Sequence, residues 1–150
     1  MLETFFATDS STITLVLRLV LGLVIIPHGL QKLFGWFGGY GFKGTMGFLT
    51  GTMKLPYLIG VLVIAAESLG ALGVIFGFAT RLGALGILAV MTGAAFTSHL
   101  PNGFFMNWTG QQKGEGYEYH LLAGAIAIAL IILGGGAFSL DSWLAAQLAS

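Results

Sequence analysis

Four apolar stretches alternate with more polar segments along the chain. Each is close to the length of about 20 apolar residues with which a helix crosses the hydrocarbon core of a bilayer. We therefore expect four membrane helices, at about 13–34, 56–76, 81–100 and 118–133. The aromatic- and glycine-rich segment at about 35–54 and the tail at about 137–148 are expected to lie at the membrane interface. The pattern predicts an all-α fold, a four-helix transmembrane bundle that forms a single domain over residues 1–150.

The composition supports a membrane location and excludes several classes of partner and cofactor. Hydrophobic residues make up 56% of the chain and charged residues only 8%, whereas soluble domains usually carry about 25% charged residues. The expected solvent is therefore a lipid bilayer. A formal net charge of zero argues against nucleic acid as a partner, because that would require a basic face. Without cysteine the chain can form neither disulfides nor cysteine-ligated iron–sulfur or zinc sites.

The ends and the positive charges bear on the orientation in the membrane. No lysine or arginine precedes the first apolar stretch, whereas a secretory signal begins with a basic region, so we expect this stretch to be retained in a multi-pass protein. Four spans place both termini on the same side. Four lysines flank the first and third connections, and two arginines lie nearer the other side: Lys32, Lys43, Lys54 and Lys113 against Arg18 and Arg81. Because cytoplasmic loops carry an excess of positive charge, this favours periplasmic termini.

Two charged residues fall deep inside the expected helices. Arg18 lies about 6 residues, or roughly 9 Å, inside the first helix, and Glu67 lies near the middle of the second. Because the long arginine side chain can reach along the bundle, Glu67 is the expected partner of Arg18. Charged residues at membrane depth are functional candidates by default, so both are candidate catalytic residues. The alternative is a buried ion pair that only fixes the register of the helices.

The histidines gather at the opposite end of the bundle from Arg18. His28, His99 and His120 are all expected there, together with Glu118. Three histidines and a carboxylate could bind a metal ion. However, no H-x-x-H or E-x-x-H pair is present, and Glu118 and His120 point to different faces of their helix. We therefore expect no metal site.

A quinone head-group site fits this end of the bundle better. His28 or His99 with Glu118 could donate hydrogen bonds to the quinone carbonyls and carry protons near neutral pH. The apolar slot for the ring could be lined by aromatic residues of the two connections, which include Trp36, Phe104 and Phe105. The alternative is an ordinary interfacial belt of aromatic residues with histidines that cap helix ends.

The first and third expected helices begin alike. The motif R-L-V-L-G starts at Arg18 and R-L-G-A-L-G starts at Arg81, and both helices end at a histidine that precedes glycine and aromatic residues. Two parallel helix hairpins would produce such a pattern. Chance similarity within an apolar chain of low complexity would produce it too, and we favour chance.

Several short motifs, in this order and spacing, resemble the DoxX family of small bacterial membrane proteins. They are R-L-V-L-G-L from Arg18, H-G-L-Q-K-L-F-G from His28, G-G-Y-G-F-K-G-T after it, Glu67, G-F-A-T-R up to Arg81, H-L-P-N-G-F-F from His99, G-Y-E-Y from Gly116 and S-L-D up to Asp141. The resemblance covers nearly the whole chain, from Arg18 to Asp141. It implies a four-helix protein of the bacterial inner membrane, whose relatives are described as subunits linked to quinol oxidation or thiosulfate:quinone oxidoreduction.

The resemblance also marks candidate positions, although the family has no agreed catalytic set. Those carried over are Arg18, His28, Lys32, Glu67, Arg81, His99 and Glu118. The leading hypothesis is a redox-linked subunit that binds quinone, or that supports another membrane oxidoreductase subunit which does. Because no flavin motif or haem-ligand pattern is visible, such a chain would need a partner or a bound cofactor to move electrons. The alternatives are a structural or assembly subunit without a ligand, and a small-solute or proton transporter that would require a homo-oligomer.

Overall fold

The computed structural model describes residues 6, 8 and 10–148, and every regular element among these residues is helical. Three helical spans are long and apolar enough to cross a membrane: Ile13–Phe34, Tyr57–Phe76 and Thr80–Asn102. A fourth apolar helix, Glu118–Leu133, is shorter, and its 16 residues reach about 24 Å at the helical rise. The predicted fold class, an all-α membrane bundle, is confirmed.

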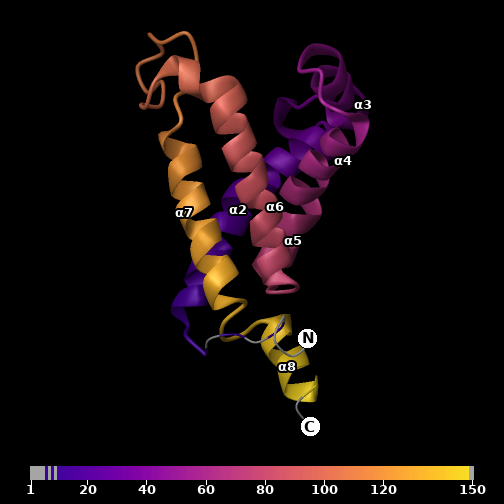
Figure 1. Cartoon of the computed structure of the whole chain (residues 1–150), viewed down its shortest axis with the longest axis vertical. Coiled ribbons are helices and arrows are strands. Elements are labelled where there is room, and N and C mark those ends of the chain that lie inside the picture. Colours follow the sequence, from indigo (N-terminus) through magenta and orange to yellow (C-terminus); the bar gives the residue numbers. More distant parts are fainter. Residues whose placement is uncertain (1–5, 7, 9, 149–150) are drawn as a thin grey trace.

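The spans run along the long axis of the molecule (Figure 1). The first is α2 (Ile13–Phe34), and the second combines α4 (Tyr57–Ala65), η3 (Ala66–Gly70) and α5 (Ala71–Phe76). The third combines α6 (Thr80–Ala94), η4 (Ala95–His99) and η5 (Leu100–Asn102), and the fourth is α7 (Glu118–Leu133). The short elements η1 (Trp36–Gly38), α3 (Gly41–Gly47) and η2 (Phe48–Thr52) connect the first two spans, and α8 (Leu140–Leu148) follows the last.

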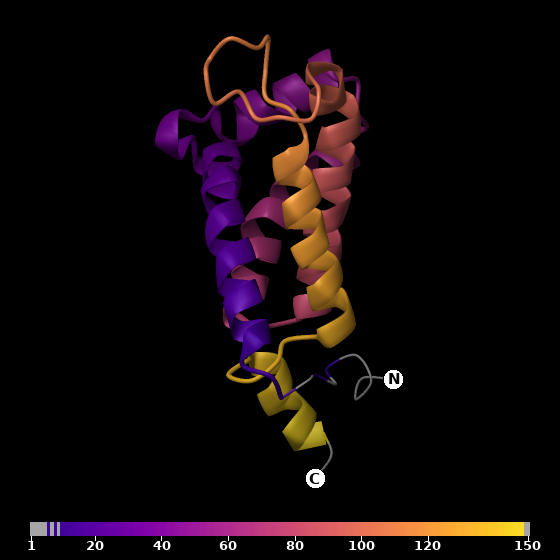
Figure 2. The same ribbon diagram turned by 90° about the vertical axis from the view of Figure 1, so that its left-hand side faces the viewer.

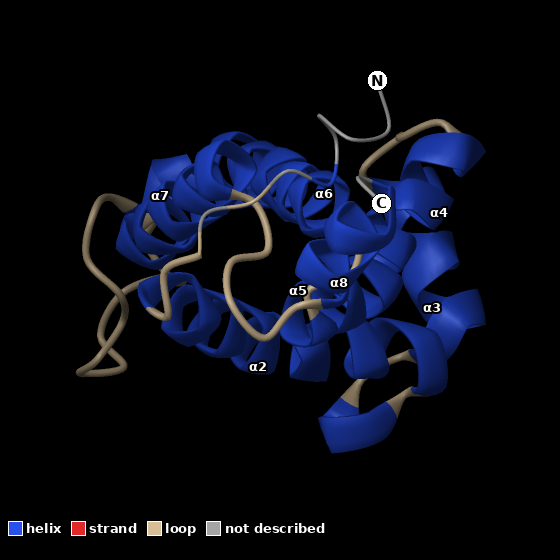
Figure 3. Cartoon of the chain, turned by 90° about the horizontal axis from the view of Figure 1, so that it is seen from below, coloured by secondary structure: helices blue, strands red, loops and turns tan. Residues whose placement is uncertain are grey.

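The two ends of the bundle differ in what covers them. The end that holds α3 and the connection 103–117, called the upper end below, lies opposite α8 (Figure 1). At the other, lower end, α8 lies below the bundle, close to where α2 begins (Figure 2). Viewed from below, α7 lies on the opposite side of the molecule from α3 and α4 (Figure 3).

The core is small and the apolar surface is large, as expected for a protein dissolved in lipid. The buried cluster between the spans consists of Leu21, Ile25, Ala71, Val74, Ala84, Ile87, Met91, Ala123, Ala127 and Leu130. Many large apolar side chains instead face outward, among them Leu23, Leu62 and Ile132. A soluble protein rarely exposes so much contiguous apolar surface, so these faces contact lipid.

Two of the spans contain a π-helical turn. The turn η3 interrupts the second span and carries Glu67, and η4 interrupts the third span and ends at His99. Such turns are rare and are frequently found at functional sites, because the extra residue displaces side chains from their α-helical positions. Two of the chemically interesting residues therefore lie on distorted helix.

Glycine brings α2 into close contact with the second span. A Cβ atom on Gly29 would overlap the backbone of Glu67, and one on Gly22 would overlap the side chain of Ile75. Small residues at such crossings let helix backbones approach in membranes, where van der Waals packing drives helix association. The Gly29 contact fixes Glu67 at the level of Gly29 on α2.

Arg18 holds the lower end of the bundle together. Its side chain is fully buried and donates to the carbonyl oxygens of Ile75, at 3.2 Å, and of Ala137 and Phe138, at 3.2 and 3.0 Å. Ile75 lies in the last turn of α5, where the carbonyls lack partners within the helix. The guanidinium therefore joins the end of the second span to the connection between α7 and α8.

The predicted pairing of Arg18 with Glu67 is wrong. Glu67 pairs instead with Lys32. The physical reason is depth: Glu67 lies level with Gly29, and Arg18 lies 11 residues before Gly29 in the same helix, which is about 16 Å along its axis. An arginine side chain does not bridge that distance.

Asp141 completes this lower end. Its carboxylate accepts the backbone N–H groups of Ala79 and Thr80, at 2.7 and 2.9 Å, and so caps the first turn of α6 from α8. Its own N–H donates to the carbonyl of Gly77 at 2.8 Å. We call Arg18, Gly77 and Asp141 the lower anchor.

Arg81 repeats the role of Arg18 in the second half of the chain. Its Nε donates to the carbonyl of Ile131 at 3.0 Å and its Nη2 to that of Ile132 at 3.2 Å, both in the last turn of α7. Each arginine thus donates to the closing turn of the next membrane helix along the chain. The similar starts of the first and third spans have similar contacts.

Candidate intramembrane polar site

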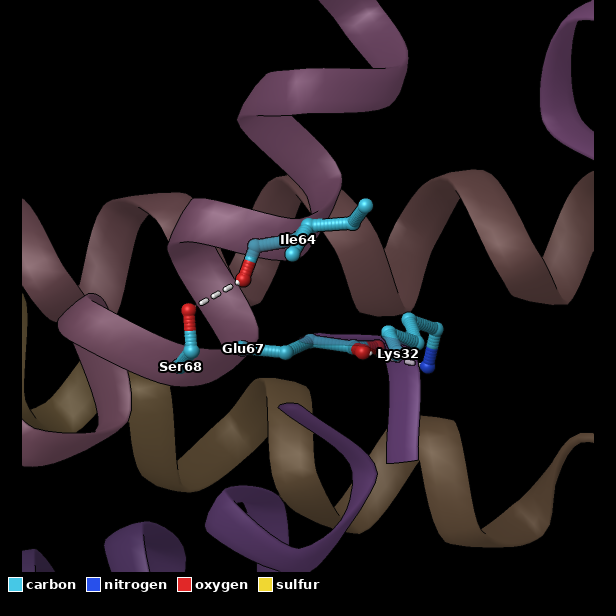
Figure 4. A network of polar contacts seen from close by, with 4 residues as sticks. All are labelled: Lys32, Ile64, Glu67 and Ser68. Carbon is cyan, nitrogen blue, oxygen red and sulfur yellow. Dashed lines mark hydrogen bonds and ion pairs between the residues drawn. The ribbon is translucent and has the colours of Figure 1, made fainter. Parts of the chain in front are cut away.

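An ion pair between Lys32 and Glu67 joins α2 to the second span (Figure 4). Glu67, on η3, is only 4% exposed. Lys32 comes from the last turns of α2, and its side chain is 27% exposed. The carboxylate is therefore held inside the bundle, while the ammonium group reaches it from the edge.

The local structure around η3 fixes the position of Glu67. Ser68 is buried, and its hydroxyl donates to the carbonyl of Ile64 at 2.6 Å (Figure 4). A serine bonded to the preceding turn in this way bends a membrane helix. On the other side, the backbone of Glu67 is pressed against Gly29, so the carboxylate has little freedom of position.

The ion pair lines a groove between the second and third spans. The groove has a volume of about 800 Å³, and Lys32 and Glu67 are its only charged lining residues among those that the structure describes. Small residues form much of both walls: Ala66, Gly70 and Gly73 on one side, and Gly83, Gly86 and Gly93 on the other. Ligand pockets are typically apolar clefts of about 300–1,000 Å³ with few polar groups, which this groove matches.

A series of rings continues from the ion pair toward the upper end. The ring centroids of His28 and Tyr119 lie 6.3 Å apart, those of Tyr119 and His120 5.4 Å, and those of His120 and His99 4.1 Å. The carboxylate of Glu67 interacts electrostatically with both His28 and Tyr119. We call His28, Tyr119, His120 and His99 the ring series.

The ring series contains buried polar atoms with nothing to bond to among the described residues. These are the hydroxyl of Tyr119 and Nδ1 of His120. Buried polar side-chain atoms are paired in the large majority of cases, so two exceptions in adjacent residues call for an explanation. His120 also lines a smaller cavity, of about 420 Å³, between the third span and α7.

Glu118 serves the upper connection rather than the ring series. Its Oε1 accepts the backbone N–H of Met106 at 2.8 Å and the indole N–H of Trp108 at 3.3 Å. In the same connection, Oε2 of Glu115 accepts the N–H of Asn107 at 2.6 Å. These carboxylates shape the connection 103–117.

The aromatic residues expected to line a quinone slot lie in two groups. Trp36 packs beside Phe34, with ring centroids 5.5 Å apart. Phe104 packs edge-on against Phe105 at 5.2 Å and against Tyr117 at 5.4 Å. None of the residues expected to bind a cofactor lines the groove that holds the ion pair; these are His28, His99, Glu118, Trp36, Phe104 and Phe105.

The sequence interpretation included Lys32 among the candidate positions and His120 among the histidines at this end, but it did not pair Lys32 with Glu67 and gave Tyr119 no role. Lys32 follows His28 by four residues on one helix, a spacing that places both on the same face. This spacing could have indicated that Lys32 belongs to the same site as His28. Tyr119 and His120 directly follow Glu118 in the chain, but nothing in the sequence shows that Tyr119 faces His28 on α2 and His120 faces His99 on the third span. Among the described residues, no group of three or more histidine or acidic side chains is arranged to hold a metal ion.

Comparisons with known proteins agree with the motifs. The chain is 34% identical over 119 residues to a Bacillus subtilis (strain 168) protein named "Putative oxidoreductase CatD", covering 78% of this chain and 77% of that protein. No solved structure matches the chain significantly. The sequence model of the DoxX family matches residues 13–100, which is more than half of the chain, and the chain therefore belongs to the DoxX family.

Proposed function

We propose that this protein is a redox-linked membrane subunit that binds quinone or quinol in the groove, with the head group at the pair of Lys32 and Glu67. The observation that carries the proposal is this one ion pair in the wall of an otherwise apolar groove. An ion pair that served only to pack the helices would not need to line a groove that a lipid-soluble molecule can reach.

The residues present fit a quinone. The ammonium group of Lys32 can donate a hydrogen bond to one quinone carbonyl, and Glu67 can exchange a proton with the reduced form. The rest of the groove lining is almost entirely apolar, which suits an isoprenoid tail. The aromatic residues of the upper connections, Trp36 and Phe104 with Phe105, are exposed and would lie at the membrane surface, where such rings settle.

The electrons would come from a partner protein or a bound cofactor. A chain without cysteine has no thiolate to hold an iron–sulfur cluster, and we favour a donor or acceptor in another subunit of a membrane oxidoreductase complex. The name of the Bacillus relative, an oxidoreductase, supports this class. The location would be the bacterial inner membrane, with the lysine-bearing upper end cytoplasmic and both termini periplasmic.

Labelling with a photoreactive quinone tests the proposal. The protein, in lipid nanodiscs, is titrated with an azido derivative of ubiquinone or menaquinone, and the labelled peptides are mapped. We expect saturable labelling of the second and third spans. Gly93→Leu should weaken binding at least about tenfold, a loss of about 1.4 kcal/mol, because Gly93 lines the groove and open space surrounds its Cβ position.

Gly47→Leu is the matched control. Open space surrounds this position too, but it lies on α3 and outside the groove lining, so binding should be unchanged. Labelling that does not saturate, or that Gly93→Leu leaves at the wild-type level, would contradict the proposal. Unsaturable labelling would favour an assembly subunit without its own ligand.

A further inference from the structure

We propose that the ring series is a proton path that connects the carboxyl group of Glu67 with the upper end of the bundle. The path serves the same site, and its purpose rests on the proposed function, since quinones take up and release protons when they are reduced and oxidised. Its existence does not depend on quinone, and it can be tested without one.

The path begins at Glu67. Three groups act on this carboxylate: Lys32, which pairs with it, and His28 and Tyr119, which interact with it electrostatically from α2 and α7. Lys32 holds the carboxylate in place through the ion pair. His28 and Tyr119 remain as the groups that can exchange a proton with Glu67.

The middle of the path consists of side chains with free positions. The hydroxyl of Tyr119 is buried without a partner among the described residues, as is Nδ1 of His120. A hydroxyl can accept a proton on its oxygen while it donates its own, and an imidazole can do the same with its two nitrogens. A buried hydroxyl and a buried imidazole nitrogen without partners are unfavourable in a packed core, but both atoms remain available for the hydrogen bonds that a relay needs.

The path ends at His99. Its Nδ1 lies 2.9 Å from the carbonyl oxygen of Glu115. A carbonyl only accepts, so Nδ1 carries the hydrogen, and in the neutral ring Nε2 is then the free acceptor. His99 lies against His120, with the two rings tilted, and is half-buried beside the exposed Glu115 of the upper connection. A proton that reaches Nε2 is therefore close to water.

Each step conserves atoms and charge. The O–H bond of Glu67 breaks as an N–H bond forms on His28, and the carboxylate that remains is balanced by the ammonium group of Lys32. The proton passes Tyr119 by exchange at its hydroxyl, then binds His120 and His99 in turn, and the last N–H bond breaks as water takes the proton. No oxidant or reductant takes part.

The lower end offers no comparable route. Below Glu67 the core consists of Leu21, Ile25 and Val74. Further down, Arg18 and Asp141 are bonded to backbone groups of the lower anchor. The buried hydroxyls of Thr14 and Thr80 lie in the first turns of α2 and α6, separated from Glu67 by this apolar core. Proton exchange is therefore directed to the upper end.

Time-resolved infrared spectroscopy tests the path in nanodiscs without quinone. A light-released proton lowers the pH, and the carbonyl stretch of protonated Glu67, identified by its loss in Glu67→Gln, is followed in time. We expect Tyr119→Phe and His120→Phe to slow its appearance at least about tenfold, which is a conservative bound because positioned proton carriers typically contribute about 10²–10⁴-fold. Both variants keep an aromatic ring at the position and remove the group that exchanges a proton.

Tyr117→Phe is the control, since Tyr117 lies in the same part of the chain but packs on Phe104 of the upper connection. Its rate should equal that of the wild type. Wild-type rates in Tyr119→Phe and His120→Phe, or the absence of any titrating band that Glu67→Gln removes, would overturn the proposal. If His120→Phe fails to fold, Tyr119→Phe still decides, because it removes only a hydroxyl group. A wild-type protein that binds no quinone would refute the proposed function. The infrared measurement is made without quinone, so it would still test the proton path.

Discussion

The ion pair of Lys32 and Glu67 predicts an asymmetric response to the loss of either partner. In Lys32→Met, the Glu67 carboxylate, only 4% exposed, remains inside the bundle without its counter-charge, and breaking a buried pair in this way costs about 3–5 kcal/mol. In Glu67→Met, the remaining ammonium group is on a side chain that is 27% exposed and near the upper end of α2. It can extend to the interface, so the expected loss is only about 1–2 kcal/mol.

The double variant Lys32→Met with Glu67→Met should recover most of this loss. Replacing a buried ion pair by apolar residues of similar volume is often neutral, so its stability should lie within about 1 kcal/mol of the wild type. The free energies come from reversible unfolding in mixed micelles of mild detergent and SDS, followed by tryptophan fluorescence. Lys43→Met, an exposed lysine on α3, is the control and should change stability by less than about 0.5 kcal/mol.

Two results would refute the reasoning. If Glu67→Met destabilised the protein as much as Lys32→Met, the difference in exposure would not govern the energetics. If the double variant lost the sum of both single losses, the two side chains would not interact. Either result would remove the ion pair as the polar element of the groove.

Two further predictions concern the packing of α2. Gly29→Ala should destabilise the protein by about 1–3 kcal/mol, because its Cβ would overlap the backbone of Glu67. Gly47→Ala, with open space around it, should be nearly neutral in the same unfolding assay. Equal effects of the two substitutions would show that this helix crossing is loosely packed. Arg18→Lys should cost about 2–4 kcal/mol, because one ammonium group cannot replace a planar guanidinium that reaches three carbonyls. Arg81→Lys, at a half-buried position, should cost less in that assay, and a wild-type midpoint for Arg18→Lys would contradict the lower anchor.

Composition and hydrophobic pattern were sufficient to predict the all-α membrane bundle. They could not predict the partner of Arg18, because pairing depends on the relative height of two helices, and small residues set that height. The contact of Gly29 with the backbone of Glu67 brings Lys32 within reach of the carboxylate and leaves Arg18 far below it. A glycine in the sequence indicates that another helix can pack closely against it, but not which residue of that helix will contact it.

The ring series was beyond the sequence for a different reason. The histidines could be assigned to one end of the bundle by counting residues along each helix. Their mutual contacts depend on the rotation of α7, which turns Tyr119 toward His28 and His120 toward His99, and on the π-helical turn that ends at His99. The turn is only five residues long, which is too short for hydrophobic periodicity to distinguish a π-helical turn from an α-helical one.

The two polar groups of this protein differ in what a ligand could reach. Arg18 is fully buried, is bonded to three backbone carbonyls and lies outside the lining of both cavities. A substrate could reach it only if the ends of the spans came apart. Lys32 and Glu67 are bonded to each other through side chains alone, face an apolar groove, and include a residue on a π-helical turn. A ligand can compete for that bond without unfolding anything, because no backbone group depends on it. The most deeply buried charge therefore holds the structure together, and this difference is why we propose the pair in the groove wall as the site of the chemistry.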